Sequence, residues 1–214
     1  MRALLAGGLV LGVGSVATLA AWTDTEWVFG GGAADGSGSG VAASVFEVEQ
    51  NVWDGAAGAA SFLDREQQEV AGGLRFSPLA ATSLSPGDVV FAPMQLRTAV
   101  RSVGASVTVA PAVMASGDSA FFGALRYSLR TGVARADCGA GAFLPGSTTG
   151  TPLVTSAALT TGSATGALQL APATASAAGA PVDLCFAITL PGGSSDSLQG
   201  LGATPVWSFQ SQSR

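Results

Sequence analysis

The sequence contains no histidine and no lysine. Histidine is the commonest general base and the commonest metal ligand in proteins, so its absence excludes His-dependent hydrolases and HExxH zinc peptidases. Every basic residue is an arginine, and the 14 acidic residues outnumber the 9 basic ones. No basic stripe is present that would neutralise phosphates, so we expect no nucleic-acid partner.

Other catalytic and cofactor motifs are weak. The nearest approach to a Gly-x-Ser-x-Gly motif is the low-complexity run at residues 36–40, around Ser37, but its central residue is Gly38 and no histidine is present to activate a serine. The glycines at 30–32 follow no core strand and open no helix, which excludes a nucleotide-binding fingerprint. Glu47 and Glu49 lie two apart on one strand face, a pattern that favours a solvated face over a carboxylate metal site. We therefore expect no enzyme activity, no cofactor and no metal site.

Cysteine is scarce, and its spacing limits its role. Cys138 and Cys185 are too far apart for a CxxC redox or zinc motif, which leaves one disulfide or two buried thiols. An oxidising destination favours the disulfide. On the chain-entropy model, closing a loop of this length stabilises the fold by about 4 kcal/mol.

The N-terminus has the pattern of a signal peptide. Arg2 precedes an apolar and small-residue run, residues 3–21, which turns polar immediately after Trp22. The run is also long enough to span a bilayer as a helix, but no basic stop-transfer cluster follows it. We expect a signal peptidase to cleave between Ala21 and Trp22. The mature protein is then secreted, extracellular or at the cell surface, and it meets a membrane only through the uncleaved signal peptide.

Residues 22–40 divide into a short aromatic segment and a linker. The linker, residues 30–40, is rich in glycine, alanine and serine and reads as flexible. In an extended conformation the segment 22–29 places alternate side chains on one side, as a pairing strand does; the alternative is a disordered tail. The side chains on that side are Thr23, Thr25, Trp27 and Phe29.

The remaining residues, 41–214, predict an all-β domain of short strands and frequent turns. Ser85-Pro86-Gly87-Asp88 fits a type II turn, and residues 61–70 favour a short helix. Short strands and few helices indicate an antiparallel β-sandwich, with a jelly roll as the preferred arrangement, preceded by the hydrophobic signal helix. The expected strands are 41–52, 74–76, 89–100, 105–109, 124–131, 153–160, 167–170, 182–190 and 205–209.

Alternation within these strands predicts which side chains are buried. Leu184, Phe186, Ile188 and Leu190 share one face. Likewise, Leu125, Tyr127 and Leu129 alternate with Arg126, Ser128 and Arg130, so we expect the arginines on a solvated face. The aromatic residues Trp53, Tyr127 and Trp207 are interpreted as core residues rather than as a carbohydrate-binding platform.

Several segments, in their order along the chain, resemble proteins with SipW-type signal peptides, which include the TasA and CalY (camelysin) biofilm-matrix proteins. The similar segments are the hydrophobic leader, its junction with the acidic turn at residues 20–26, and the turn at 84–88 that precedes a strand. The closing strands, 184–191 and 207–209, resemble exported relatives of high-GC Gram-positive bacteria.

The resemblance implies a jelly-roll subunit of extracellular fibres, in which the N-terminal strand of one subunit completes a sheet of the next. The expected partners are further copies of this chain or a related matrix subunit, besides the signal peptidase that acts during export. The alternative function is a monomeric secreted adhesin or carbohydrate-binding β-sandwich module.

Overall fold

Short strands pack as antiparallel sheets, with almost no helix, in the computed structural model, which describes residues 40, 42–77 and 81–214. Residues Ser44–Arg214 form one compact unit. Its strands are β1 (Val48–Asn51), β2 (Val89–Thr98), β3 (Ala105–Val109), β4 (Val113–Gly117), β5 (Arg126–Thr131), β6 (Thr151–Ala158), β7 (Leu168–Leu170), β8 (Val182–Thr189), β9 (Ala203–Val206) and β10 (Phe209–Ser213). Between them lie the α-helix α2 (Ser119–Ala124) and the 3₁₀ turns η1 (Ala56–Gly58), η2 (Gln68–Val70), η3 (Arg135–Asp137), η4 (Ala140–Phe143) and η5 (Asp196–Leu198).

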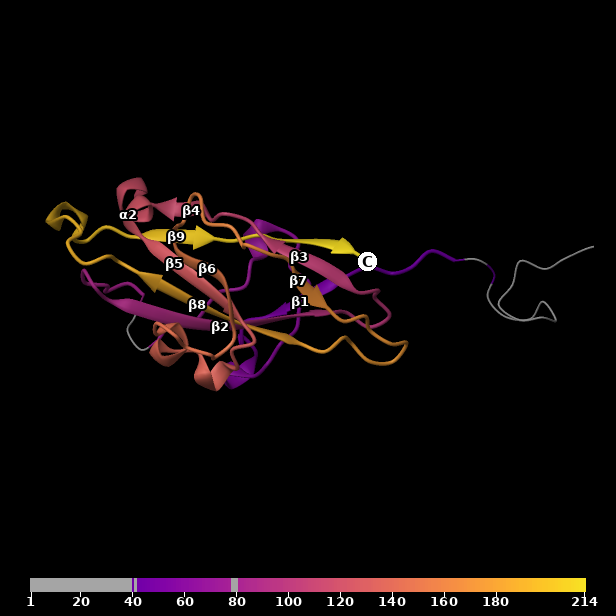
Figure 1. Cartoon of the computed structure of the whole chain (residues 1–214). Helices are drawn as coiled ribbons and strands as arrows, with labels where there is room; N and C mark the ends of the chain where they lie inside the picture. The colour runs from indigo at the N-terminus through magenta and orange to yellow at the C-terminus, as the bar shows by residue number, and fades with distance from the viewer. Residues whose placement is uncertain (1–39, 41, 78–80) are drawn as a thin grey trace, which may run out of the picture. The chain divides into compact units, whose positions relative to one another are not determined.

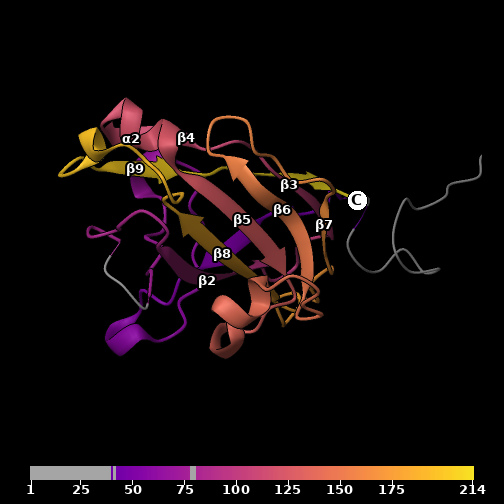
Figure 2. The same cartoon turned by 60° about the vertical axis from the view of Figure 1, so that its left-hand side comes forward.

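The first layer is a five-stranded sheet with the order β1-β2-β8-β5-β6. β8 pairs with β2 along its whole length, from Val89 opposite Thr189 to Leu96 opposite Val182. Figure 2 shows β2, β8, β5 and β6 lying next to one another. All the pairings of these strands are antiparallel, as predicted for a sandwich.

The second layer consists of two short sheets that share one ladder. Their orders are β10-β3-β7 and β4-β9. β4 follows β3 and β10 follows β9, so both sheets belong to one long antiparallel pairing that is interrupted at residues 110–112 and 207–208. The Ala110 N–H donates to the Ser208 carbonyl at 3.1 Å and links the two parts. Figure 1 shows β9, β4 and β3 along one side of the molecule, with β2 and β8 on the other.

Apolar side chains fill the space between the layers. Phe186 of β8 lies 4.9 Å from Trp207 and 6.4 Å from Phe209 between ring centroids, which joins the first layer to the second. Tyr127 and Leu129 are buried with them, as the alternation in β5 predicts. Trp53 is also buried, and Trp207 packs against the core while half-buried. The interpretation of these aromatics as core residues is confirmed.

The turn at Ser85–Asp88 is confirmed in detail. The Asp88 N–H donates to the Ser85 carbonyl at 2.9 Å, and Gly87 has a φ of 98°. A positive φ at the third position defines a type II turn and favours glycine there. The turn delivers the chain into β2.

The predicted helix at residues 61–70 is wrong. Leu63 instead exchanges two backbone hydrogen bonds with Gln50, so this stretch borders β1 as an isolated bridge. Only η2 is helical within it, and that turn is a 3₁₀ turn. Pairing with a strand edge offers the backbone long-range partners that a short exposed helix lacks.

Other boundaries also differ from prediction. β4 and α2 were not expected, and the predicted strand 205–209 is broken between β9 and β10. The predicted strand 41–52 is reduced to β1. Residues 74–76 form no strand, and only the following residue, Ser77, makes an isolated bridge with Phe91. The predicted signal peptide 1–21, its cleavage site at Ala21 and Trp22, and the segment with Thr23, Thr25, Trp27 and Phe29 lie outside the described residues.

Candidate functional site

The outer side of β10 is an open sheet edge. β10 is the last strand of its sheet, and among the strands that the structure describes it pairs with β3 alone. Hydrogen bonds join Ala110 to Ser208 at one end of this pairing and Arg214 to Gly104 at the other. Antiparallel hydrogen-bonded pairs alternate, so the even-numbered residues of β10 face β3. The backbone N–H and C=O groups of Phe209, Ser211 and Ser213 therefore point away from the sheet.

β9 continues this edge toward the other end of the ladder. Pro205 lies within β9, a position that proline occupies almost only in edge strands because it lacks an N–H. β9 pairs with β4 on one side, and no described strand pairs with its other side. The edge from Ala203 to Ser213 is thus available for a further strand, with its donors reduced at Pro205.

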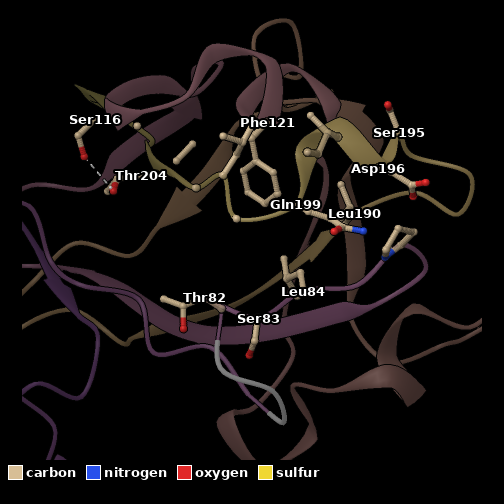
Figure 3. Close-up of a pocket in the computed structure, with 18 residues that line it drawn as sticks. Thr82, Ser83, Leu84, Ser116, Phe121, Leu190, Ser195, Asp196, Gln199 and Thr204 are labelled. Atoms are coloured by element: carbon tan, nitrogen blue, oxygen red, sulfur yellow. Dashed lines mark hydrogen bonds between the residues drawn. The ribbon is translucent and has the colours of Figure 1, made fainter.

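A cleft of about 700 Å³ adjoins β9 (Figure 3). One wall comes from the loop before β2, with Leu84 and Thr82, and the other from α2, β4 and β9. Phe121 and Leu190 lie at its apolar interior, and Figure 3 shows the Phe121 ring facing Leu84 across the cleft. The 18 lining residues are Ala81–Leu84, Pro86, Ser116, Gly117, Phe121, Leu190, Ser195, Asp196 and Leu198–Thr204.

Local sequence explains how the cleft residues are placed. The Asp118 carboxylate accepts from the N–H groups of Ala120 and Phe121 at 2.8 and 3.1 Å, which caps α2 and fixes the Phe121 backbone. Gly117, with a φ of 109°, lies so close to the Gly202 backbone that a side chain would clash there. This close approach holds β4 against the start of β9.

The rim of the cleft is polar. The Ser116 hydroxyl donates to the Thr204 hydroxyl at 3.2 Å across the β4–β9 pair. Asp196 and Gln199 are exposed on the loop between β8 and β9. The cleft therefore combines an apolar interior with hydroxyl, amide and carboxylate groups at its mouth, which suits a peptide or a sugar more than a wholly apolar ligand.

Beneath the open edge, Tyr127 and Trp207 form part of the core. Their ring centroids lie 5.4 Å apart. Nε1 of Trp207 is buried and has no hydrogen-bond partner among the described residues. Since Trp207 occupies the break between β9 and β10, this unpaired N–H lies where the edge strand is interrupted.

The predicted disulfide is confirmed. It joins the segment at residues 132–150, called here the covering segment, to the outer face of the first layer. Cys138 and Cys185 are joined, with their Cα atoms 5.5 Å apart. Cys185 packs with Val133 and Ala142, so β8 is buried on both faces and not on one, as its alternation alone suggests. Phe143 of the same segment stacks on Phe91 at 5.7 Å.

Arg126 and Arg130, which the alternation in β5 places on a solvated face, are partly exposed and bind backbone carbonyls. Arg130 donates to the carbonyl groups of Ser147, Thr149 and Gly150 at 2.8–3.1 Å, so it ties β5 to the covering segment. Arg126 folds back onto the carbonyls of residues 123–125. Both side chains therefore anchor the backbone.

The two glutamates near β1 form no shared site. The Glu49 carboxylate forms an ion pair with Arg97 at 2.7 Å. The Arg97 guanidinium also lies 3.8 Å from the centroid of the Phe62 ring. Within the ranges that the structure covers, no three His, Cys, Asp or Glu side chains gather closely enough to hold a metal ion. In those same ranges, no helix is both long and apolar enough to cross a membrane.

The candidate site was missed at the sequence level because its parts lie in glycine- and serine-rich loops that carry no periodic signal. The open edge depends on the order of the strands in the sheet, and the cleft is formed by segments that lie far apart in the sequence. No protein-family model matches the sequence, and no curated protein matches it significantly.

Proposed function

We propose that this chain is a secreted, non-enzymatic structural protein, a subunit or accessory of extracellular biofilm-matrix fibres that assembles by donation of its N-terminal strand. The observation that carries the proposal is the open edge of β9 and β10, which borders an apolar cleft. An edge of this kind accepts an additional strand through backbone hydrogen bonds. The two antiparallel layers are arranged, in this proposal, as a jelly-roll-like sandwich.

The donated strand is the segment 22–29 of another copy. Its backbone pairs with the outward-facing groups of Phe209 and Ser211 and continues along β9, so that Trp27 and Phe29 bury their rings in the cleft beside Phe121. Full burial of one such ring contributes roughly 2 to 3 kcal/mol. The linker at residues 30–40 lets the segment leave its own domain without strain.

Export fits the same proposal. The predicted signal peptide delivers the mature chain, beginning at Trp22, to the outside of the cell. The Cys138–Cys185 disulfide is compatible with an oxidising compartment.

The test compares the mature chain with a variant that lacks residues 22–29. We expect the mature chain to give concentration-dependent oligomers or filaments by sedimentation and negative-stain microscopy. The truncated variant should stay monomeric with an unchanged circular dichroism spectrum. Equal assembly of both proteins excludes strand donation by this segment.

A monomeric secreted binding module is the second candidate function, and the polar rim of the cleft favours it. Ser116, Thr204 and Gln199 supply hydroxyl and amide groups of the kind that bind sugar hydroxyls. If the mature chain remains monomeric at every concentration and binds a polysaccharide, with loss of binding in Gln199→Ala, this candidate replaces the fibre subunit.

A further inference from the structure

The two ends of the long β3–β4 and β9–β10 ladder differ in shape and charge. At one end, β10 finishes beside the start of β3, and Val103, Gly104, Pro172 and Arg214 line an open hollow of about 510 Å³. At the other end, the loop between β8 and β9 carries η5 and Asp196. Figure 1 shows this loop, in gold beside α2, at the opposite end of the ladder from the C-terminus.

The hollow is flanked by a second arginine in an unusual conformation. Arg101 has a φ of 70°, a left-handed conformation that is uncommon for a residue with a side chain. Its N–H donates to the Thr174 carbonyl at 2.9 Å, which fixes the turn beside Pro172. The guanidinium groups of Arg101 and Arg214 make no ion pair with any described carboxylate. The Arg101 Nε donates to the Ala175 carbonyl at 3.5 Å, and both arginines are exposed on this end.

The Asp196 loop is complementary to this end. Asp196 is exposed and makes no ion pair with a described arginine. Leu201 on the same loop is 38% exposed, and at the hollow end Val45 and Val100 are 49% and 44% exposed. Arg126 follows α2 in the sequence, and its guanidinium donates to the backbone carbonyls of residues 123–125. One end thus presents a carboxylate with an apolar neighbour, and the other presents two guanidinium groups with apolar neighbours.

We propose that the Asp196 loop of one copy docks in the Arg101–Arg214 hollow of a second copy. The contact is heterologous, because its two halves lie at opposite ends of the ladder, and such contacts repeat into open filaments unless they close into a ring. Opposite charges fix the orientation of the copies, and the apolar side chains add buried area.

The inference rests on the proposed function and explains how strand donation is aligned. The Val103 N–H donates to the Val45 carbonyl at 3.0 Å, so the domain begins at the hollow end. In the docked pair, the start of one domain lies beside the cleft end of its neighbour. The residues between Phe29 and Val45 span at most roughly 50 Å when extended. Docking thus brings the donor segment within reach of the acceptor edge.

A charge-swap experiment tests the contact in the mature chain. Variant one carries Arg101→Glu and Arg214→Glu, and variant two carries Asp196→Arg. Each reverses one half of the contact, so each alone should raise the critical concentration for assembly roughly tenfold or more. In a mixture the two variants can alternate along the filament. The glutamates of variant one then meet the arginine that replaces Asp196 in variant two, and at the next junction the native arginines of variant two meet the native Asp196 of variant one. Assembly should therefore return in the mixture, measured by light scattering and microscopy.

The control is Asp137→Arg, which makes the same charge change on exposed η3, in the segment that the disulfide joins to β8. It should assemble like the parent. If both reversed variants assemble like the parent, or if mixing them restores nothing, the end-to-end contact is overturned, while truncation of residues 22–29 still reports on strand donation. A parent chain that never assembles overturns both proposals.

Discussion

The Tyr127 hydroxyl donates a hydrogen bond to the Gly162 carbonyl at 2.7 Å inside the core. Burial raises the pKa of this hydroxyl above its usual value, and the nearby indole of Trp207 opposes the shift in part. The Trp207 contact itself falls short of hydrogen-bond geometry. Tyr127 therefore stays protonated at neutral pH and remains a donor, connecting β5 to the loop after β6.

Replacement of Tyr127 by phenylalanine should lower the free energy of unfolding by about 1 to 3 kcal/mol, because the buried Gly162 carbonyl loses its partner. Urea unfolding followed by circular dichroism measures the change. Thr108→Val is the matched control, since it removes an exposed hydroxyl whose 3.4 Å hydrogen bond to Gln210 is long. Similar losses in both variants contradict a special role for the buried bond.

Loss of the disulfide should destabilise the domain by about 4 kcal/mol when Cys138 and Cys185 are both changed to serine. The covering segment at residues 132–150 should also become sensitive to proteases, because the disulfide fixes it to β8. Urea unfolding and limited proteolysis of the double variant test both effects. Two alkylatable thiols in the unreduced parent, detected by mass spectrometry, contradict the bond itself.

The ion pair of Asp54 with Arg65 predicts a pH-dependent term in stability. The hydrogen bond from Arg65 is the main cause that lowers the pKa of Asp54 below its usual value of 3.8. The folded state thus favours the carboxylate, so the contribution is present above pH 3.8 and is lost as the pH falls through the lowered pKa. Because the pair lies at the surface, its size is less than about 1 kcal/mol.

Asp54→Asn should therefore reduce the free energy of unfolding at neutral pH and make no difference in acid below the lowered pKa. Asp64→Asn, an exposed acid in the same segment, serves as the control and should change little at either pH. Urea unfolding at both pH values gives the comparison. An equal deficit of Asp54→Asn at both pH values rules out the ion pair as its source.

The sequence predicts the fold well where one face of a strand is buried. In β5, Tyr127 and Leu129 alternate with arginines and their burial follows the pattern. In β8 the alternation identifies the core face but not the second buried face, because Cys185 is covered by a segment that a distant disulfide holds. Local pattern carries no information about such long-range covers.

The wrong helix prediction at residues 61–70 and the failure to predict the cleft have the same cause, which is long-range backbone pairing. Residues 61–70 look helical, but Leu63 gains backbone partners on β1, and tertiary pairing outweighs a weak local preference. β4 is exposed throughout, so it shows no alternation of burial that could mark it as a strand. Its pairing with β9, and hence the wall of the cleft, depends on the close approach of Gly117 to Gly202.

The open edge itself can be closed by one substitution. The Ser211 N–H faces away from β3, so proline at this position removes no ladder hydrogen bond and only fills the outer side of β10. Ser211→Pro should therefore keep the stability of the monomer close to that of the parent. Strand addition should be lost, because the acceptor edge lacks a donor and carries a ring in the path of the incoming backbone.

The measurement pairs urea unfolding with sedimentation of the mature chain, and Ser211→Ala is the control that keeps the backbone N–H. We expect Ser211→Ala to assemble like the parent and Ser211→Pro to remain monomeric while folded. If Ser211→Pro assembles as well as the parent, the donated strand does not use β10. If it unfolds instead, the Ser211 N–H faces β3, and the assignment of the outward groups on this edge is wrong.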